Sequence, residues 1–201
     1  MKKVFIDGSA GTTGLRIFDR LHRRTDIQLL TLPESERKLE ASRKKMLNEA
    51  DVVFLCLPDD AACEAALWVE NPDTVVLDTS TAHRTAPGWC YGFPELSPVR
   101  EARLRQAKRI AVPGCHASGF IALVYPLVSA GLLTPDALLS CYSLSGYSGG
   151  GKKMIAEYRA PERSFLLNAP RQYALGQTHK HLKEMKAVTG LANEPVFCPV
   201  V

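Results

Sequence analysis

No stretch of this sequence is long and apolar enough to span a membrane, which takes about 20 consecutive apolar residues. The N-terminus begins with charge but lacks the long apolar centre of a secretion signal, so residues 4–7 are better interpreted as a first strand. The chain also lacks a run of Lys and Arg with interleaved aromatic residues, and its net charge is only +4. We therefore expect a cytoplasmic protein without a membrane or nucleic-acid partner.

Closely spaced cysteine pairs are missing as well. The six cysteines are Cys56, Cys63, Cys90, Cys115, Cys141 and Cys198. No two of them have C-x-x-C spacing, so a structural zinc site is not expected. A reducing cytosol would keep them as thiols.

Short apolar segments alternate with helical patterns in the first half of the chain. Strands are predicted at residues 4–7, 27–32, 51–57 and 74–78, and helices at 15–21, 37–48 and 60–69, the last capped by Asp59 or Asp60. This alternation is typical of a doubly wound α/β domain. We predict a Rossmann-type dinucleotide-binding domain over residues 1–114.

Residues 115–201 have a different pattern and predict an α+β catalytic or substrate domain. A strand is expected at residues 138–144 and a helix at 153–158, whereas residues 145–152 are too rich in glycine for a regular element. The sequence ends in an apolar, strand-like segment at 195–201, and no capping element follows it. We therefore expect this second domain to be incomplete at its C-terminus.

A glycine-rich turn follows the first predicted strand and opens the first predicted helix. It consists of Gly8, Ser9, Ala10, Gly11, Thr12, Thr13 and Gly14. Glycines allow the backbone to approach a pyrophosphate, and the helix N-terminus stabilises its charge. The strand–turn–helix context predicts dinucleotide binding; the alternative is a tight glycine turn without a ligand.

The end of the second strand indicates which dinucleotide is bound. An NAD site usually has an acidic residue here for the ribose 2′-hydroxyl. Ser35, Arg37 and Lys38 could instead bind the 2′-phosphate of NADP, with Arg37 as a bidentate partner. Glu34 and Glu36 leave open the alternative of a solvated helix start with mixed charge.

Cys115 follows a Pro-Gly elbow and precedes an apolar helical run. A helix N-terminus favours the thiolate, and its unpaired N–H groups can hold the oxyanion that forms when a thiolate attacks an acyl carbon. Most free cysteines are small buried hydrophobic residues, but the elbow and the cofactor motif favour a nucleophile here.

His179 and His181, followed by Glu184, lie in a polar setting. One of them could take the proton of Cys115 while a carboxylate orients it. If the segment is helical, residues two apart do not face the same site, and Glu184 pairs more naturally with His181, which leaves His179 for Cys115. His116 should point away from Cys115 for the same helical reason. A surface histidine pair is the alternative.

Residues 78–84 follow the fourth predicted strand, where open α/β sheets bind ligands. Arg84 could clamp a phosphate at this edge. A surface arginine is an equally good interpretation of the spacing.

Together, the glycine-rich turn, residues 78–84, 91–96 and 145–152, the Pro-Gly-Cys elbow and the His-x-His-x-x-Glu pattern resemble the N-acetyl-gamma-glutamyl-phosphate reductases. The likeness is to their shorter subfamily, within the aspartate-semialdehyde dehydrogenase-like superfamily, although the family's enzymes are longer than this chain. The resemblance implies NADPH-dependent reduction of N-acetyl-L-glutamyl 5-phosphate to N-acetyl-L-glutamate 5-semialdehyde and phosphate, through a thioester on the cysteine, in arginine biosynthesis.

The resemblance also implies residue roles. Cys115 is the nucleophile and His179 the base, with His181 in reserve; Ser148 and Gly149 lie near the cofactor. Substrate contacts are expected from Arg84, Ser145, Lys152, His181 and Glu184. We expect a homo-oligomer. The alternatives are a dinucleotide-binding fragment or sensor module without turnover, and an activity like that of aspartate-semialdehyde dehydrogenase.

Overall fold

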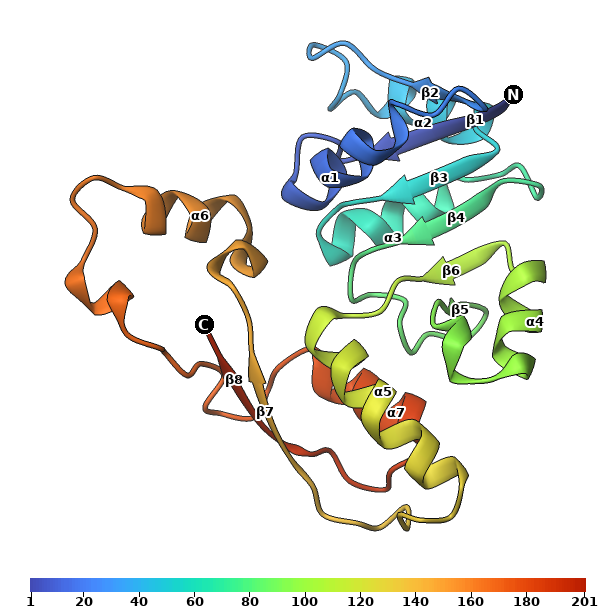
Figure 1. Cartoon of the computed structure of the whole chain (residues 1–201). Coiled ribbons are helices and arrows are strands. Elements are labelled where there is room, and N and C mark those ends of the chain that lie inside the picture. Colours follow the sequence, from blue (N-terminus) through green and yellow to red (C-terminus); the bar gives the residue numbers. More distant parts are fainter. The chain divides into compact units, whose positions relative to one another are not determined.

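The computed structural model describes all 201 residues as two compact units, Met1–Pro113 and Gly114–Val201 (Figure 1). The first unit contains one parallel sheet in the order β2-β1-β3-β4-β6-β5. Its strands are β1 (Lys2–Asp7), β2 (Ile27–Leu30), β3 (Val52–Leu55), β4 (Val75–Asp78), β5 (Cys90–Tyr91) and β6 (Arg109–Ala111). The predicted doubly wound α/β fold is confirmed.

Four helices accompany this sheet: α1 (Thr12–Leu21), α2 (Glu40–Glu49), α3 (Asp59–Leu67) and α4 (Pro98–Gln106). The core lies where apolar strand residues meet α2 and α3. Phe5, Leu47, Val53 and Val76 are buried in it, and Trp68 packs against its edge. The burial explains why β3 and β4 read as almost continuous apolar runs.

Several sequence-based details of this unit were wrong. Helix α2 begins at Glu40, three residues later than expected, and β5, α4 and β6 were not foreseen. The N-cap of α3 is Pro58, and Asp59 instead accepts hydrogen bonds from the N–H and hydroxyl of Thr81 at 3.0 and 2.7 Å. Because the Asp59 carboxylate is bonded to Thr81, it does not cap α3.

The second unit combines two packed helices, α5 (Cys115–Ser129) and α7 (His181–Thr189), with a two-stranded parallel sheet. The sheet pairs β7 (Ser140–Leu144) with β8 (Val196–Val200), so that Tyr142 lies opposite Cys198. Phe120, Ile121, Met185 and Phe197 are buried in this unit. None of the helices in the structure has the length and apolar character of a membrane span.

The glycine-rich segment after β7 contains regular structure, contrary to expectation. Tyr147–Gly150 form a 3₁₀ turn, and α6 (Gly151–Arg159) begins directly after it. Gly151 takes a φ of +71°, which glycine adopts without strain. The Tyr147 ring stacks on Tyr158 of α6 with 4.8 Å between ring centroids. This stacking packs the glycine-rich turn against α6 and stabilises it.

Candidate functional site

The glycine-rich turn between β1 and α1 is shaped by close backbone contacts. Gly8 has a φ of +84°, and a Cβ there would lie 2.3 Å from the carbonyl oxygen of Cys56. A Cβ on Gly14 would lie 2.4 Å from the carbonyl oxygen of Gly8. Gly11 is the N-cap of α1, where no side chain caps the helix and the first turn has no acidic residue. The N-terminus of α1 thus has no side-chain cap, and a helix end of this kind can bind a phosphate.

A buried ion pair that sequence reasoning missed precedes this turn. Arg43 of α2 donates through Nη2 to Asp7 at 2.9 Å, and the two side chains are 13% and 5% exposed. The guanidinium also lies 4.7 Å from the ring centroid of Trp68. Asp7 is thereby fixed directly before Gly8. Residues 36 positions apart carry no pattern that could have announced this pair.

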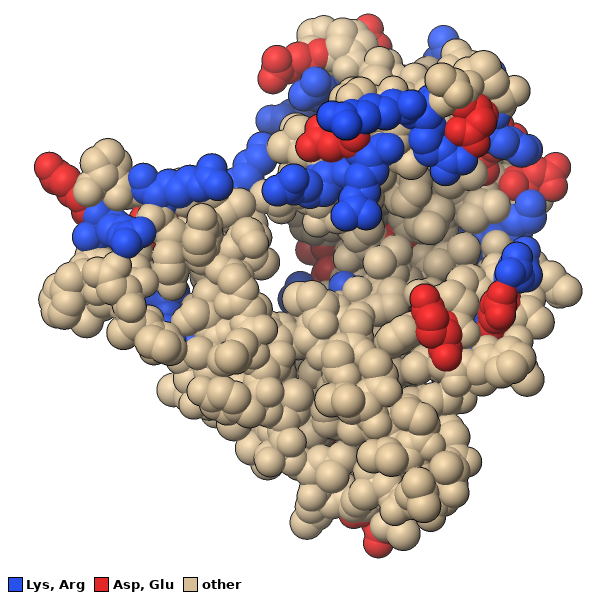
Figure 2. Space-filling model, in the orientation of Figure 1, with Lys and Arg blue, Asp and Glu red and all other residues tan.

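Ser35, Arg37 and Lys38 are all exposed in the segment between β2 and α2. Glu36, by contrast, is half-buried and accepts a hydrogen bond from the Ser42 hydroxyl at 2.8 Å. Glu36, one of the two acidic residues of this segment, is thus hydrogen-bonded to α2, whereas the basic side chains of Arg37 and Lys38 are exposed to solvent. Figure 2 shows Lys and Arg side chains gathered on this side of the first unit.

Residues 78–84 form a tight network at the carboxyl end of β4. The buried Asp78 carboxylate accepts the hydroxyl of Ser80 at 2.6 Å and lies 2.6 Å from Nδ1 of His83. The His83 ring stacks on Trp89 with 3.9 Å between centroids. This network orders the loop that carries Arg84.

Arg84 itself is partly committed to the main chain. Its Nε donates to the carbonyl of Val112 at 3.0 Å and its Nη2 to that of Thr79 at 3.2 Å. The expected position at the sheet edge is found. A phosphate would share this guanidinium with the two carbonyls.

Cys115 is the first residue of α5 and is exposed, with Gly114 as the N-cap. Among the other cysteines only Cys63 is exposed. Burial raises the pKa of the Cys56 thiol to about 11 and also raises the pKa of Cys141. Cys115 is therefore the thiol that combines solvent access with the start of a helix.

Glu184 of α7 connects the start of α5 to the histidines. Its side chain is almost fully buried, and it accepts the backbone N–H of Gly114 at 3.1 Å. Its other oxygen lies 3.9 Å from Nε2 of His181. The carboxylate thus fixes the N-cap before Cys115 and lies beside one ring of the histidine pair.

The two histidines lie together, so the expectation that they face different sites is wrong. Helix α7 begins at His181, so His179 precedes the helix and the helical spacing rule does not apply. The ring centroids are 4.7 Å apart at an interplanar angle of 81°. The backbone N–H of His181 donates to Nδ1 of His179 at 3.2 Å.

His116 joins the same cluster, which sequence reasoning had excluded. Its buried ring lies 6.0 Å from that of His179 and 5.7 Å from that of His181, between centroids. Its Nδ1 lies 2.6 Å from the hydroxyl of Ser143, and its Nε2 lies 2.8 Å from that of Tyr173. Burial lowers the pKa of His116, so the ring is neutral near pH 7. Tyr173 was also missed, because no motif marks it.

The remaining predicted residues lie around the glycine-rich segment. Ser145 follows β7 and lies near Tyr173, whose hydroxyl contacts His116 of the histidine cluster. Ser148 and Gly149 are exposed in the 3₁₀ turn, and Lys152 is exposed in the first turn of α6.

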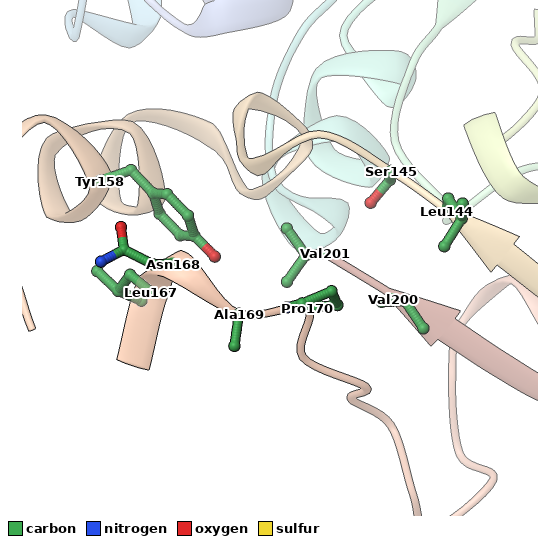
Figure 3. A pocket seen from close by; sticks show the side chains of 9 residues that line it. All are labelled: Leu144, Ser145, Tyr158, Leu167, Asn168, Ala169, Pro170, Val200 and Val201. Atoms are coloured by element: carbon green, nitrogen blue, oxygen red, sulfur yellow. The ribbon is translucent and has the colours of Figure 1, made fainter. Parts of the chain in front are cut away.

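A cavity of about 310 Å³ lies beside Ser145 (Figure 3). Its lining is mostly apolar and consists of Leu144, Ser145, Tyr158, Leu167, Asn168, Ala169, Pro170, Val200 and Val201. Neither Cys115 nor a histidine is part of it. The cavity is therefore separate from the thiol site, with Ser145 as their common neighbour.

Comparison with known proteins confirms the family that the motifs indicated. The semialdehyde dehydrogenase NAD-binding domain matches residues 31–104, and the semialdehyde dehydrogenase dimerisation domain matches residues 115–201. N-acetyl-gamma-glutamyl-phosphate reductase 2 of Pseudomonas putida is 48% identical over 198 residues, which are 98% of this chain and 62% of that protein. The reductase of Trichormus variabilis is 46% identical over 203 residues, covering 99% of this chain and 63% of the relative. The chain thus spans less than two thirds of the length of these relatives.

Solved structures of aspartate semialdehyde dehydrogenases share the fold. Enzyme II of Vibrio cholerae, complexed with ASA, has a TM-score of 0.67 at 16% identity, covering 99% of this chain and 70% of that one. The Candida albicans enzyme with NADP has a TM-score of 0.62 at 18% identity, covering 99% and 68%. Models of two semialdehyde dehydrogenase domains together match most of the chain, and the two reductases align with nearly all of it. The chain therefore belongs to the semialdehyde dehydrogenase family.

Proposed function

We propose that this chain carries the cofactor and thiol sites of an NADPH-dependent N-acetyl-gamma-glutamyl-phosphate reductase of arginine biosynthesis. The observation that carries the proposal is the exposed Cys115 at the start of α5, with Glu184 joining its N-cap to His181. The relatives at 46–48% identity bear the name of this enzyme.

The chemistry begins at Cys115. Its thiolate adds to the acyl carbon of N-acetyl-L-glutamyl 5-phosphate, and phosphate leaves with the bonding electron pair, which gives a thioester. With NADPH held at the glycine-rich turn, the thioester would receive the hydride that reduces it. The thiohemiacetal then returns its C–S electron pair to Cys115, and N-acetyl-L-glutamate 5-semialdehyde is released.

The proton of Cys115 passes to the histidine pair. The sequence favours His179 as the base, whereas two contacts favour His181. His181 has the carboxylate of Glu184 beside it, which can stabilise an imidazolium. Nδ1 of His179 already accepts a backbone N–H, so a neutral His179 carries its proton on Nε2 and acts as a donor.

We assign cofactor binding to residues 8–14, where Cβ atoms on Gly8 and Gly14 would collide with the carbonyl oxygens of Cys56 and Gly8, so that the turn can form only with glycine at both positions. Ser35, Arg37 and Lys38 would hold the 2′-phosphate, and Ser148 and Gly149 would lie near the nicotinamide. Arg84, Ser145 and Lys152 are the proposed substrate contacts. We further propose a cytoplasmic homo-oligomer, because residues 115–201 match a dimerisation domain and the chain has no cysteine in a disulfide.

The test is phosphate-dependent reduction of NADP with N-acetylglutamate semialdehyde. It is run with this chain and with a version extended to the length of the relatives, and aspartate semialdehyde serves as the competing substrate. Activity with the acetylglutamyl substrate is expected. NADPH binding without turnover in both versions would favour the second candidate, a dinucleotide-binding module, which the 62–65% coverage of the relatives keeps open.

A further inference from the structure

The hydroxyl of Tyr173 has a fixed position within the second unit. His116 Nε2 lies 2.8 Å from it. The backbone is fixed too, because the Tyr173 N–H donates to the carbonyl of Pro199 at 3.1 Å and Gln172 bridges Val200. The tyrosine ring lies 5.9 Å from that of His179, between centroids.

The bonds around His116 determine what this hydroxyl can do. A neutral imidazole has one N–H donor and one lone pair. When Ser143 donates to Nδ1, the proton of His116 is on Nε2 and is donated to the Tyr173 oxygen. The phenol oxygen then accepts from His116, and its own proton is directed to another partner.

Cys115 is the direct neighbour, along the chain, of the histidine that contacts this hydroxyl. Burial raises the pKa of Tyr173, so its hydroxyl keeps its proton near neutral pH and can donate it in a hydrogen bond. Cys115 and His116 are also the first two residues of α5. One helix terminus thus presents both the thiol and the ring that orients the tyrosine.

We propose that Tyr173 is a catalytic residue that donates a hydrogen bond to the acyl oxygen while Cys115 adds to the acyl carbon, and that His116 is the positioning residue for this donor. As the S–C bond forms, the carbonyl π pair moves onto oxygen, and Tyr173 stabilises that charge. The pair returns when phosphate leaves. This inference rests on the proposed role of Cys115 as the nucleophile.

The test compares two reactions of the same thiol. Acetyl phosphate acylates Cys115 through an oxyanion, whereas iodoacetamide alkylates it without one. Tyr173→Phe should slow acylation about 10²–10³-fold relative to alkylation, the usual loss for one oxyanion donor. The matched control is Tyr142→Phe on β7, where the side chain is 70% exposed, and it should leave the ratio of the two rates unchanged. Mass spectrometry of the modified peptide locates both products.

A Tyr173→Phe variant that slows both reactions equally would overturn the inference, because a structural defect moves both rates together. Acylation of the wild-type chain at a residue other than Cys115 has a different meaning. It would overturn the proposed function, and the inference with it.

The role of His116 has its own test. If it acts through Tyr173, then His116→Gln combined with Tyr173→Phe should acylate no more slowly than Tyr173→Phe alone. If the two losses of acylation rate multiply in the double variant, His116 has a role independent of Tyr173, and the positioning assignment is overturned. Since His116 is buried, Ser143→Ala provides a second variant that removes only the Nδ1 partner. Ser143→Ala should lower the acylation-to-alkylation ratio by less than Tyr173→Phe does. An unchanged ratio would contradict the positioning role of His116.

Discussion

Glu184 accepts the backbone N–H of Gly114 at 3.1 Å, 70 residues away in the chain. The bond places a buried carboxylate at the N-terminus of α5, where the helix dipole stabilises negative charge. The other oxygen of Glu184 lies 3.9 Å from His181. The same side chain therefore holds the start of the cysteine helix and the start of the histidine helix together.

Replacing Glu184 should separate its structural and electrostatic roles. Glu184→Ala leaves the buried Gly114 N–H without its partner, which should cost about 1–3 kcal/mol of unfolding free energy. Glu184→Gln retains an acceptor oxygen and should lose less stability, while turnover falls because the charge beside His181 is gone. Urea unfolding of both variants measures the difference. Equal destabilisation by Ala and Gln would contradict the hydrogen-bond role.

Cys115 should be the first thiol to react with iodoacetamide near neutral pH, because it is exposed at a helix N-terminus. Alkylation should abolish turnover. Cys63 is the matched comparison, since it is also exposed but lies within α3. Faster labelling of Cys63, together with an active Cys115→Ser variant, would rule out Cys115 as the nucleophile.

Arg37→Ala should weaken binding of NADPH much more than binding of NADH. Losing a charge-assisted bidentate contact typically costs about 1.5–3 kcal/mol, on the order of tenfold or more in affinity. Arg105→Ala on α4 is the control, because this side chain is also exposed and pairs only with Glu101 within its helix. Fluorescence titration with the two nucleotides measures the effect. Equal weakening of both would remove the case for a 2′-phosphate contact.

Gly8→Ala should disrupt the dinucleotide site far more than Gly88→Ala does. Both glycines have a positive φ, +84° and +80°, so both variants bear a similar backbone cost of about 1–2 kcal/mol. Only at Gly8 would the new Cβ collide, 2.3 Å from the carbonyl oxygen of Cys56, whereas nothing lies within 4 Å at Gly88. Thermal unfolding and NADPH titration of the two variants test this. Similar losses in both would mean that the turn relaxes around the methyl group.

The sequence predicted the first four strands of the sheet in the first unit because they form short apolar runs, and it predicted the turn before α1 because that turn needs glycine. Cys115 at a helix start followed from the Pro-Gly elbow. What could not be predicted were partners brought together by tertiary packing: Asp7 with Arg43, and His116 with Tyr173. The error on His179 and His181 came from assuming a helix across both, whereas α7 begins only at the second.

His179 and His181 are distinguished by their neighbours, and their variants should differ accordingly. A general base contributes about 10²–10⁴-fold to turnover, so the variant that removes it should lose that much while NADPH binding is retained. His181 has Glu184 beside its Nε2, whereas His179 receives a backbone N–H on Nδ1. We therefore expect His181→Asn to lose more activity than His179→Asn. His181→Asn should also remove the acidic limb of the pH–rate profile, since a base must be deprotonated to act and its rate falls as pH drops below its pKa. Steady-state rates from pH 5 to 9 measure both effects. A larger loss in His179→Asn, with the acidic limb intact in His181→Asn, would return the role of the base to His179.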